Sequence, residues 1–371
     1  MKQILTLLLA VVLCLSLFAC ATPTDNTPGT TQETVNKTPV VEEHVCKFET
    51  ENNSIQNFKT HGRTTLTKGG LVCDLSASGI ELNAYIEGII SVELYVTAEC
   101  YFTLYIDGVR SQDRIKVTEG SKTIELANFA EGGVHNIKLI KQTESNRSLC
   151  NIKKVEFKGY FEATPEEKNL YIEFIGDSIT AGYGNLCTNG TANPGSAMNQ
   201  DATKAYAYLT AEALNADYSL VCCSGIGLAK GYAEYTMDSF FKAASYHRSQ
   251  TDVFTAIRTP DLIVINLGTN DNSKGSTHAE LADKVPGLIN LIRTTYGKEI
   301  PIIWVHGMMG EGKWANIEHI IKTDFGGESG GIYSLEIARN AQGGGSHPSG
   351  EAHISAAEAL VKFIKDMGIN K

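Results

Sequence analysis

The chain has 371 residues, of which 42% are hydrophobic and 20% are charged, so it is long enough to bury the cores of two domains. Its 42 acidic residues outnumber its 32 lysines and arginines, which gives a formal net charge of −10. A field of that sign repels polyanions and no basic run offsets it, so the composition argues against nucleic-acid binding. The composition does not argue against neutral ligands such as sugars.

The first 20 residues predict an export signal. An apolar run extends from Ile4 to Ala19, which is shorter than the roughly 20 residues that a membrane-spanning helix needs. The run ends in LFAC at Cys20 and resembles a bacterial lipoprotein signal, in which the cysteine becomes the lipid-modified first residue. The bulky Phe18 leaves cleavage of an ordinary signal nearby as the alternative. We expect an exported lipoprotein, at the cell surface or in the periplasm of a bacterium, anchored to the membrane through acyl chains on Cys20.

Two patterns follow the leader. Residues 21–43 are rich in Thr, Pro, Asn and Gln, and they predict a disordered tether. Residues 44–162 hold short alternating runs between turn residues, which predict an antiparallel β-sandwich. The clearest of these predicted strands are 79–84, 91–96, 102–106 and 135–140.

The last part of the chain, residues 168–371, alternates strand and helix patterns. The predicted strands are 171–175, 218–221, 262–267, 302–305 and 332–335, and the predicted helices are 203–214, 278–296 and 349–367. This order indicates an α/β domain with a doubly wound parallel sheet. Ligands of such domains bind beyond the carboxyl ends of the strands.

The nine cysteines do not form a metal or redox motif. Cys14 and Cys20 lie in the leader, and the other seven show no C-x-x-C spacing. We interpret most of them as small buried residues, with one or two disulfides left open and no pairing assigned.

Four chemically suitable residues follow the predicted strands of the α/β domain. Ser178 lies in the segment GDSITAGYGN (176–185), where the start of a helix would expose its hydroxyl and leave its N–H free. Gly225 lies in SGIG (224–227), Asn270 in LGTND (267–271) and His347 in GGGSHPS (343–349). Together they supply a nucleophile, two hydrogen-bond donors and a base at one edge of the sheet.

Other readings of the same segments are weaker. Asp177 and Asp271 suggest a two-carboxylate glycosidase, but side-chain bonds that hold their own loops are the simpler interpretation. The glycines of 225–231 do not have the spacing of a dinucleotide fingerprint. His347 and His353 do not match a zinc helix motif.

The four blocks resemble the SGNH (GDSL-like) hydrolase superfamily, and within it carbohydrate esterase family 2. The resemblance extends to the sandwich, through HGR (61–63), IDG (106–108) and KQTE (141–144), and so covers nearly everything after the tether. It implies a jelly-roll sandwich followed by an SGNH (flavodoxin-like) hydrolase domain. It also implies a serine esterase that removes acetyl groups from plant cell-wall polysaccharides such as xylan and glucomannan.

The resemblance also implies roles for the site residues. Ser178 would be the nucleophile and His347 the base, and the N–H groups of Ser178 and Gly225 with the Asn270 amide would form the oxyanion hole. No metal or cofactor is implied. The superfamily's usual aspartate three residues before the histidine is Gly344 here. We therefore expect a Ser–His dyad in which a carbonyl from 343–346 orients the imidazole, as in some members of the family.

Two aromatic residues are candidate sugar contacts, namely Tyr183 and Trp314, although core packing explains either equally well. Three functions stay open: a polysaccharide acetyl esterase, an SGNH esterase acting on a lipid or peptidoglycan ester, and a non-catalytic glycan-binding lipoprotein. The presence of all four site residues argues against the last.

Overall fold

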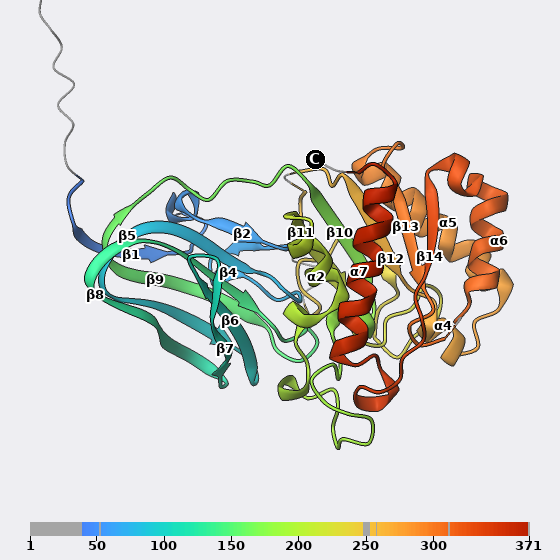
Figure 1. Ribbon diagram of the computed structural model, residues 1–371, viewed down its shortest axis with the longest axis horizontal. Helices are drawn as coiled ribbons and strands as arrows, with labels where there is room; N and C mark the ends of the chain where they lie inside the picture. Colours follow the sequence, from blue (N-terminus) through green and yellow to red (C-terminus); the bar gives the residue numbers. More distant parts are fainter. Residues whose placement is uncertain (1–38, 52, 248–252, 257, 311, 370–371) are drawn as a thin grey trace, which may run out of the picture. The chain divides into compact units, whose positions relative to one another are not determined.

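A computed structural model describes residues 39–51, 53–247, 253–256, 258–310 and 312–369 of the chain. The export signal, the lipidation site at Cys20 and most of the predicted tether lie outside the described residues. Residues Val40–Lys371 form one compact unit. In it, an all-β domain precedes an α/β domain, as the sequence predicts (Figure 1).

The all-β domain is built from nine strands in the described chain, all paired antiparallel. They are β1 (Glu42–Lys47), β2 (Lys59–His61), β3 (Thr65–Thr67), β4 (Gly70–Val72), β5 (Gly79–Val96), β6 (Cys100–Ile106), β7 (Val109–Val117), β8 (Gly120–Lys141) and β9 (Cys150–Phe161). Strand β1 pairs with β9 from Glu42 onward, so the last two residues of the predicted tether belong to the sheet.

Strand β5 corrects one prediction. The segments 79–84 and 91–96 were expected to be separate strands, but they belong to one strand that pairs with β8 along its length. The pairing shifts register between Ile86 and Gly88, and Gly88 has a φ of +77°. The segment between the two predicted strands is therefore a bulge, not a turn. A bulge of this kind bends a continuous strand and so helps the sheet to curve.

The α/β domain contains a five-stranded parallel sheet in the order β11-β10-β12-β13-β14, which confirms the predicted sheet. Its strands are β10 (Tyr171–Gly176), β11 (Asp217–Cys222), β12 (Leu262–Asn266), β13 (Ile302–His306) and β14 (Ile332–Glu336). Its α-helices are α1 (Ser178–Ala181), α2 (Tyr206–Ala213), α3 (Met237–Phe240), α4 (Thr269–Ser273), α5 (His278–Tyr296), α6 (Trp314–Phe325) and α7 (Gly350–Asp366).

Helices cover both faces of this sheet (Figure 1). On one face, Phe174 of β10 shares a buried cluster with Tyr206 of α2 and Leu360 of α7. On the other, Ile175 shares a cluster with Leu288 of α5 and with residues of α6. Adjacent residues of one strand thus enter opposite cores, which is why these strands are continuously apolar.

Capping residues help to explain which helices could be predicted from the sequence. Helix α5 has the predicted bounds because Thr277 and Glu280 form a capping box at its start. Helix α7 begins after Ser349, whose hydroxyl accepts from the Ala352 N–H. Helix α6 was not predicted, and the residue before it, Lys313, makes no side-chain cap.

The seven cysteines in the described chain are free thiols, and all except Cys187 are buried. Burial raises the pKa of Cys46 to about 11, so that thiol stays protonated near neutral pH. Within the described residues, no helix is both long enough and apolar enough to cross a bilayer.

Candidate active site

One cavity of about 530 Å³ brings together the four residues that the sequence singles out, Ser178, Gly225, Asn270 and His347. They come from the carboxyl ends of β10, β11 and β12 and from the loop before α7. The cavity therefore lies where a parallel α/β sheet places its ligands.

Ser178 is the first residue of α1, directly after β10. Asp177 caps this turn, because its Oδ1 accepts from the N–H of Ile179 at 3.0 Å. The serine is only 6% exposed, yet it lines the cavity. Its own N–H has no hydrogen-bond partner among the described residues, as expected for the first turn of a helix.

His347 contacts the serine directly. Its Nε2 lies 2.8 Å from Ser178 Oγ, and its Nδ1 lies 3.1 Å from the carbonyl oxygen of Gly345. A carbonyl only accepts, so the proton belongs on Nδ1 and Nε2 is left to accept from the hydroxyl. Burial lowers the pKa of His347 below its ordinary value of 6.5, although the Gly345 carbonyl and the charge of Glu144 oppose this. The neutral imidazole is thus the favoured form near pH 7.

Glycines bring the histidine loop against the serine loop. The N–H of Gly344 donates to the carbonyl of Gly184 at 2.8 Å. A Cβ on Gly184 would lie 2.6 Å from the Gly344 oxygen, and one on Gly344 would lie 2.4 Å from Cys187 Sγ. Side chains at either position would separate the two loops, and with them Ser178 from His347.

Gly225 presents its backbone to the same cavity. Its φ is +84°, and a Cβ there would lie 3.0 Å from Tyr232 Cβ. Its carbonyl accepts from the N–H groups of Tyr232 (2.7 Å) and Ala233 (3.0 Å), which fixes the peptide. Its own N–H has no partner within the described part of the chain, so it remains available to a ligand.

Asn270 reaches the cavity from α4, but its amide also binds the neighbouring loops. Its Nδ2 donates to the Ile226 carbonyl at 2.8 Å and to Asp177 Oδ2 at 3.2 Å. Of the two bonds, the one to Asp177 is longer. A ligand oxygen in the cavity would therefore compete with Asp177 for one amide proton.

The two aspartates hold loops, as the simpler interpretation expected. Asp271 accepts from the N–H groups of Leu228 (2.8 Å), Ala229 (2.7 Å) and Lys230 (3.0 Å). Asp177 is fully buried, and that burial, together with the charge of Asp271, raises its pKa to about 7. Both carboxylates are therefore positioned by backbone donors beside the cavity.

The two candidate sugar contacts lie in different places. Tyr183 lines the cavity, with its ring 4.3 Å from that of His347. Trp314 lines a separate cavity and stacks on His306, with ring centroids 4.2 Å apart. Trp314 therefore lies outside the cavity that holds Ser178, in contrast to Tyr183.

Several lining residues were not singled out from the sequence. They are Asn146, Arg147, Ser224, Tyr232, Ala233, Tyr246, Thr269, Ser273, Met309 and Gly345. Asn146 and Arg147 belong to the segment between β8 and β9, so the sandwich forms part of the cavity wall. No spacing rule predicts that contact, because it joins residues of two domains.

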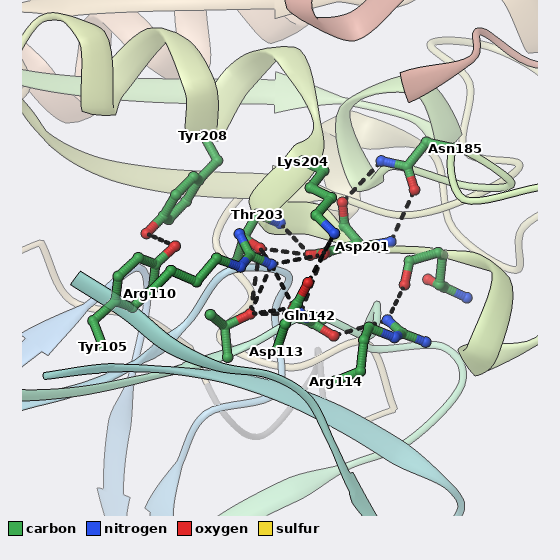
Figure 2. A network of polar contacts seen from close by, with 12 residues as sticks. Tyr105, Arg110, Asp113, Arg114, Gln142, Asn185, Asp201, Thr203, Lys204 and Tyr208 are labelled. Carbon is green, nitrogen blue, oxygen red and sulfur yellow. Dashed lines mark hydrogen bonds and ion pairs between the residues drawn. The ribbon is translucent and has the colours of Figure 1, made fainter. Parts of the chain in front are cut away.

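The sandwich also holds the loop that follows the serine, as Figure 2 shows. Asn185 and Asp201 exchange two bonds of 2.9 Å through the Asn185 side chain and the Asp201 backbone. The buried Asp201 carboxylate accepts in turn from Arg110 at 3.0 Å and Gln142 at 3.1 Å, both of which belong to the sandwich. Arg114 donates to two further carbonyls of the same loop.

In the described residues, no group of three or more His, Cys, Asp or Glu side chains is arranged to hold a metal ion. The chemistry that this site offers is that of a serine hydroxyl, an imidazole and amide donors.

Comparisons with known proteins agree with this description. Residues 60–165 match the Carbohydrate esterase 2 N-terminal family, and residues 174–324 match the GDSL-like Lipase/Acylhydrolase family. The chain is 32% identical over 235 residues to Cellulase/esterase CelE of Acetivibrio thermocellus, covering 61% of this chain and 28% of that protein. It is 25% identical over 264 residues to an Acetylxylan esterase / glucomannan deacetylase of Cellvibrio japonicus, covering 68% and 73% of the two chains.

A solved structure is similar over nearly its whole length. It is a family two carbohydrate esterase from Clostridium thermocellum in complex with cellohexaose. The two share 27% identity and a TM-score of 0.76, over 85% of this chain and 100% of that one.

The GDSL-like match, together with a serine beside a histidine at the carboxyl edge of the sheet, defines a carboxylic ester hydrolase. The matches in both domains narrow the class further. Both domains of this chain are similar to those of carbohydrate esterase family 2.

Proposed function

We propose that the protein is an esterase that removes O-acetyl groups from plant cell-wall polysaccharides, with acetylated xylan and glucomannan as substrates. The observation that carries the proposal is the chain of two contacts from Ser178 Oγ to His347 Nε2 (2.8 Å) and from His347 Nδ1 to the Gly345 carbonyl (3.1 Å). These two residues act as a dyad, in which a carbonyl takes the place of the usual carboxylate.

The reaction proceeds through an acetyl-enzyme. Ser178 Oγ attacks the acetyl carbonyl carbon while its proton passes to His347 Nε2. The tetrahedral intermediate collapses, the bond to the sugar oxygen breaks, and Nε2–H protonates the leaving alkoxide. A water molecule then attacks the acetyl-serine, giving its proton to Nε2. Acetic acid leaves and ionises in solvent, and the proton on Nε2 returns to Ser178 Oγ.

A carbonyl can fix the histidine tautomer but cannot balance a full positive charge. The half-buried imidazole, with its lowered pKa, therefore gains a proton only while the substrate oxygen carries negative charge.

The oxyanion is stabilised by donors that face the cavity. The N–H groups of Ser178 and Gly225 are free of other partners in the described chain. Asn270 adds a third donor when the substrate oxygen replaces Asp177 as the partner of its amide. Removing one donor of this kind typically raises the barrier by about 2.7–4 kcal/mol.

The substrate class is supported by relatives and by the cavity. One curated relative is named an acetylxylan esterase and glucomannan deacetylase, and one similar structure holds cellohexaose. The cavity is lined by three tyrosines, Tyr183, Tyr232 and Tyr246, whose rings suit the faces of pyranose sugars.

The test is acetate release from acetylated xylan and from acetylated glucomannan by the purified protein and by its Ser178→Ala variant. The proposal requires that the parent protein releases acetate and that the variant does not. Equal background release by both would contradict it and favour a glycan-binding protein. Release confined to lipid or peptidoglycan esters would contradict the substrate class alone.

We also propose that the protein is exported and anchored to a bacterial membrane by acyl chains on Cys20. Growth of the producing cells with a labelled fatty acid should label the parent protein but not a Cys20→Ala variant. Label in both, or in neither, would contradict the anchor and leave the proposed chemistry unaffected.

A further inference from the structure

Glu144, a carboxylate of the sandwich, binds Ser224, which is the residue before the proposed oxyanion donor Gly225. Glu144 is wholly buried, and it accepts three hydrogen bonds. Its Oε2 accepts from the N–H of Ser224 at 2.9 Å, and its Oε1 accepts from the Ser224 hydroxyl at 2.9 Å and from Arg147 Nε at 3.3 Å. A carboxylate removed from water requires such partners, and two of the three donors belong to Ser224, in the loop after β11.

The segment that carries Glu144 is itself fixed. The buried Lys141 donates to the carbonyls of Asp74 (2.7 Å) and Thr143 (2.6 Å). The N–H of Glu144 donates to the Gln200 side chain at 3.2 Å. The carboxylate thus approaches Ser224 from a rigid support, so it can hold the loop rather than follow it.

The peptide between Ser224 and Gly225 is held on both sides. Glu144 binds the N–H and hydroxyl of Ser224, while Tyr232 and Ala233 donate to the carbonyl of Gly225. Between these bonds lies the Gly225 N–H, which has no partner in the described chain. Removing the bonds on the Ser224 side would leave this N–H free to rotate away from the cavity.

We propose that Glu144 positions the Gly225 N–H for the oxyanion, so that the sandwich completes the active site of the hydrolase domain. This inference rests on the proposed esterase function. Glu144 is a positioning residue, because its bonds reach Ser224 and Arg147 and none reaches the reacting atoms.

The competing explanation is that Glu144 only joins the two domains. A matched contact exists at the other end of the same strand, where the buried Lys59 of the sandwich pairs with Asp217, the first residue of β11, at 2.6 Å. Lys59→Met breaks a charged contact between the same two domains far along the strand from the cavity. It therefore serves as the control for a purely structural role.

The experiment compares the parent protein, Glu144→Gln, Ser224→Ala, the double variant and Lys59→Met. Turnover of an acetyl ester is measured below the melting temperature of each. We expect Glu144→Gln to lower kcat about tenfold to a hundredfold, because complete loss of one oxyanion donor costs about 10²–10³. KM should change less than about threefold, since the contact acts on the transition state. Ser224→Ala should lower kcat less, and the double variant should be no worse than Glu144→Gln.

A second readout needs no turnover. A boronic acid that forms a tetrahedral adduct with Ser178 places an oxygen in the oxyanion hole, so Glu144→Gln should weaken its binding by the same factor as kcat. Lys59→Met should lower the melting temperature and leave both quantities unchanged.

The inference is overturned if Glu144→Gln and Ser224→Ala keep kcat and boronate binding within about threefold of the parent, or if Lys59→Met lowers them equally. Should Glu144→Gln not fold, Ser224→Ala alone decides, because it removes one hydroxyl and leaves the buried carboxylate its other two donors. Failure of the proposed function has a different signature, namely no Ser178-dependent activity in the parent protein.

Discussion

The sandwich contacts the hydrolase domain at both ends of strand β11, but only the contact at the carboxyl end lies beside the active-site cavity. At the amino end, Lys59 pairs with Asp217, and nearby Arg63 binds Glu173 of the adjacent strand at 2.9 Å. At the carboxyl end, Glu144 binds Ser224 beside the cavity. In each of these contacts, a buried charged side chain of the sandwich binds a residue of the hydrolase domain. Their place along the sheet, rather than their chemistry, separates a structural contact from one at the active site.

The two ends of β11 also differ in the surroundings of the residues that form these contacts. Arg63 donates to the carbonyl of Phe241 and to the hydroxyl of Tyr296 as well as to Glu173, so its bonds stay within the packed interior. Ser224 is followed by Gly225, which lines the cavity and whose N–H has no partner in the described chain.

The first prediction tests whether the reaction takes place at Ser178, at the carboxyl edge of the parallel sheet. Ser178→Ala should reduce kcat on an acetyl ester by more than about 10³-fold, because the nucleophile is lost while the oxyanion donors remain. An unchanged melting temperature serves as the control. Activity within tenfold of the parent would place the reaction elsewhere.

The second prediction concerns the amino end. Arg63→Met leaves Glu173 as an unpaired buried charge, so the free energy of unfolding should fall by about 3–5 kcal/mol, as measured by chemical denaturation. The double variant Arg63→Met with Glu173→Gln should recover part of that loss. At temperatures where the variant is folded, kcat should equal that of the parent. A selective loss of kcat would break the distinction between the two ends.

The third prediction addresses the side-chain donor. Asn270→Ala should lower kcat by about 10²-fold, since one oxyanion donor is lost. The exposed Asn272 of the same helix provides the matched control, and Asn272→Ala should have no effect. A loss below about threefold for Asn270→Ala would mean that its amide stays with Ile226 and Asp177 throughout the reaction.

The fourth prediction concerns pH. His347 must be neutral to accept the proton of Ser178, and burial lowers its pKa, so the fall of kcat/KM that reports this residue should lie below pH 6.5. The groups around the imidazole are Ser178, Tyr183, the Gly345 carbonyl, the charge of Glu144, and His353, whose burial lowers its pKa to about 3 and keeps it neutral. A fall above pH 6.5 that persists in an Asp177→Asn variant would contradict the neutral imidazole, because the pKa of Asp177 is itself raised to about 7.

Much of the hydrolase domain could be predicted from the sequence. The bounds of helix α5 and the places of Ser178 and His347 follow from local signals, because caps, strand ends and glycine-rich loops depend on neighbouring residues. The segment KQTE, which carries Glu144, was noticed only as part of a family resemblance.

The rest required the tertiary structure. Glu144 reaches Ser224 across 80 positions, and no periodicity predicts a contact between domains. The bend in β5 looked like the gap between two strands because a bulge and a turn use the same residues. For Trp314, core packing and a sugar contact were equally open, because sequence alone does not distinguish a stacked aromatic residue from an exposed one.

The central claim is that Ser178, activated by His347, carries the acetyl group during turnover. Mass spectrometry of the acid-quenched reaction tests it most directly. The account predicts that the peptide containing Ser178 gains the mass of one acetyl group, and that this adduct is absent from Ser178→Ala. An adduct on another residue, or acetate release that continues in Ser178→Ala, would contradict the account.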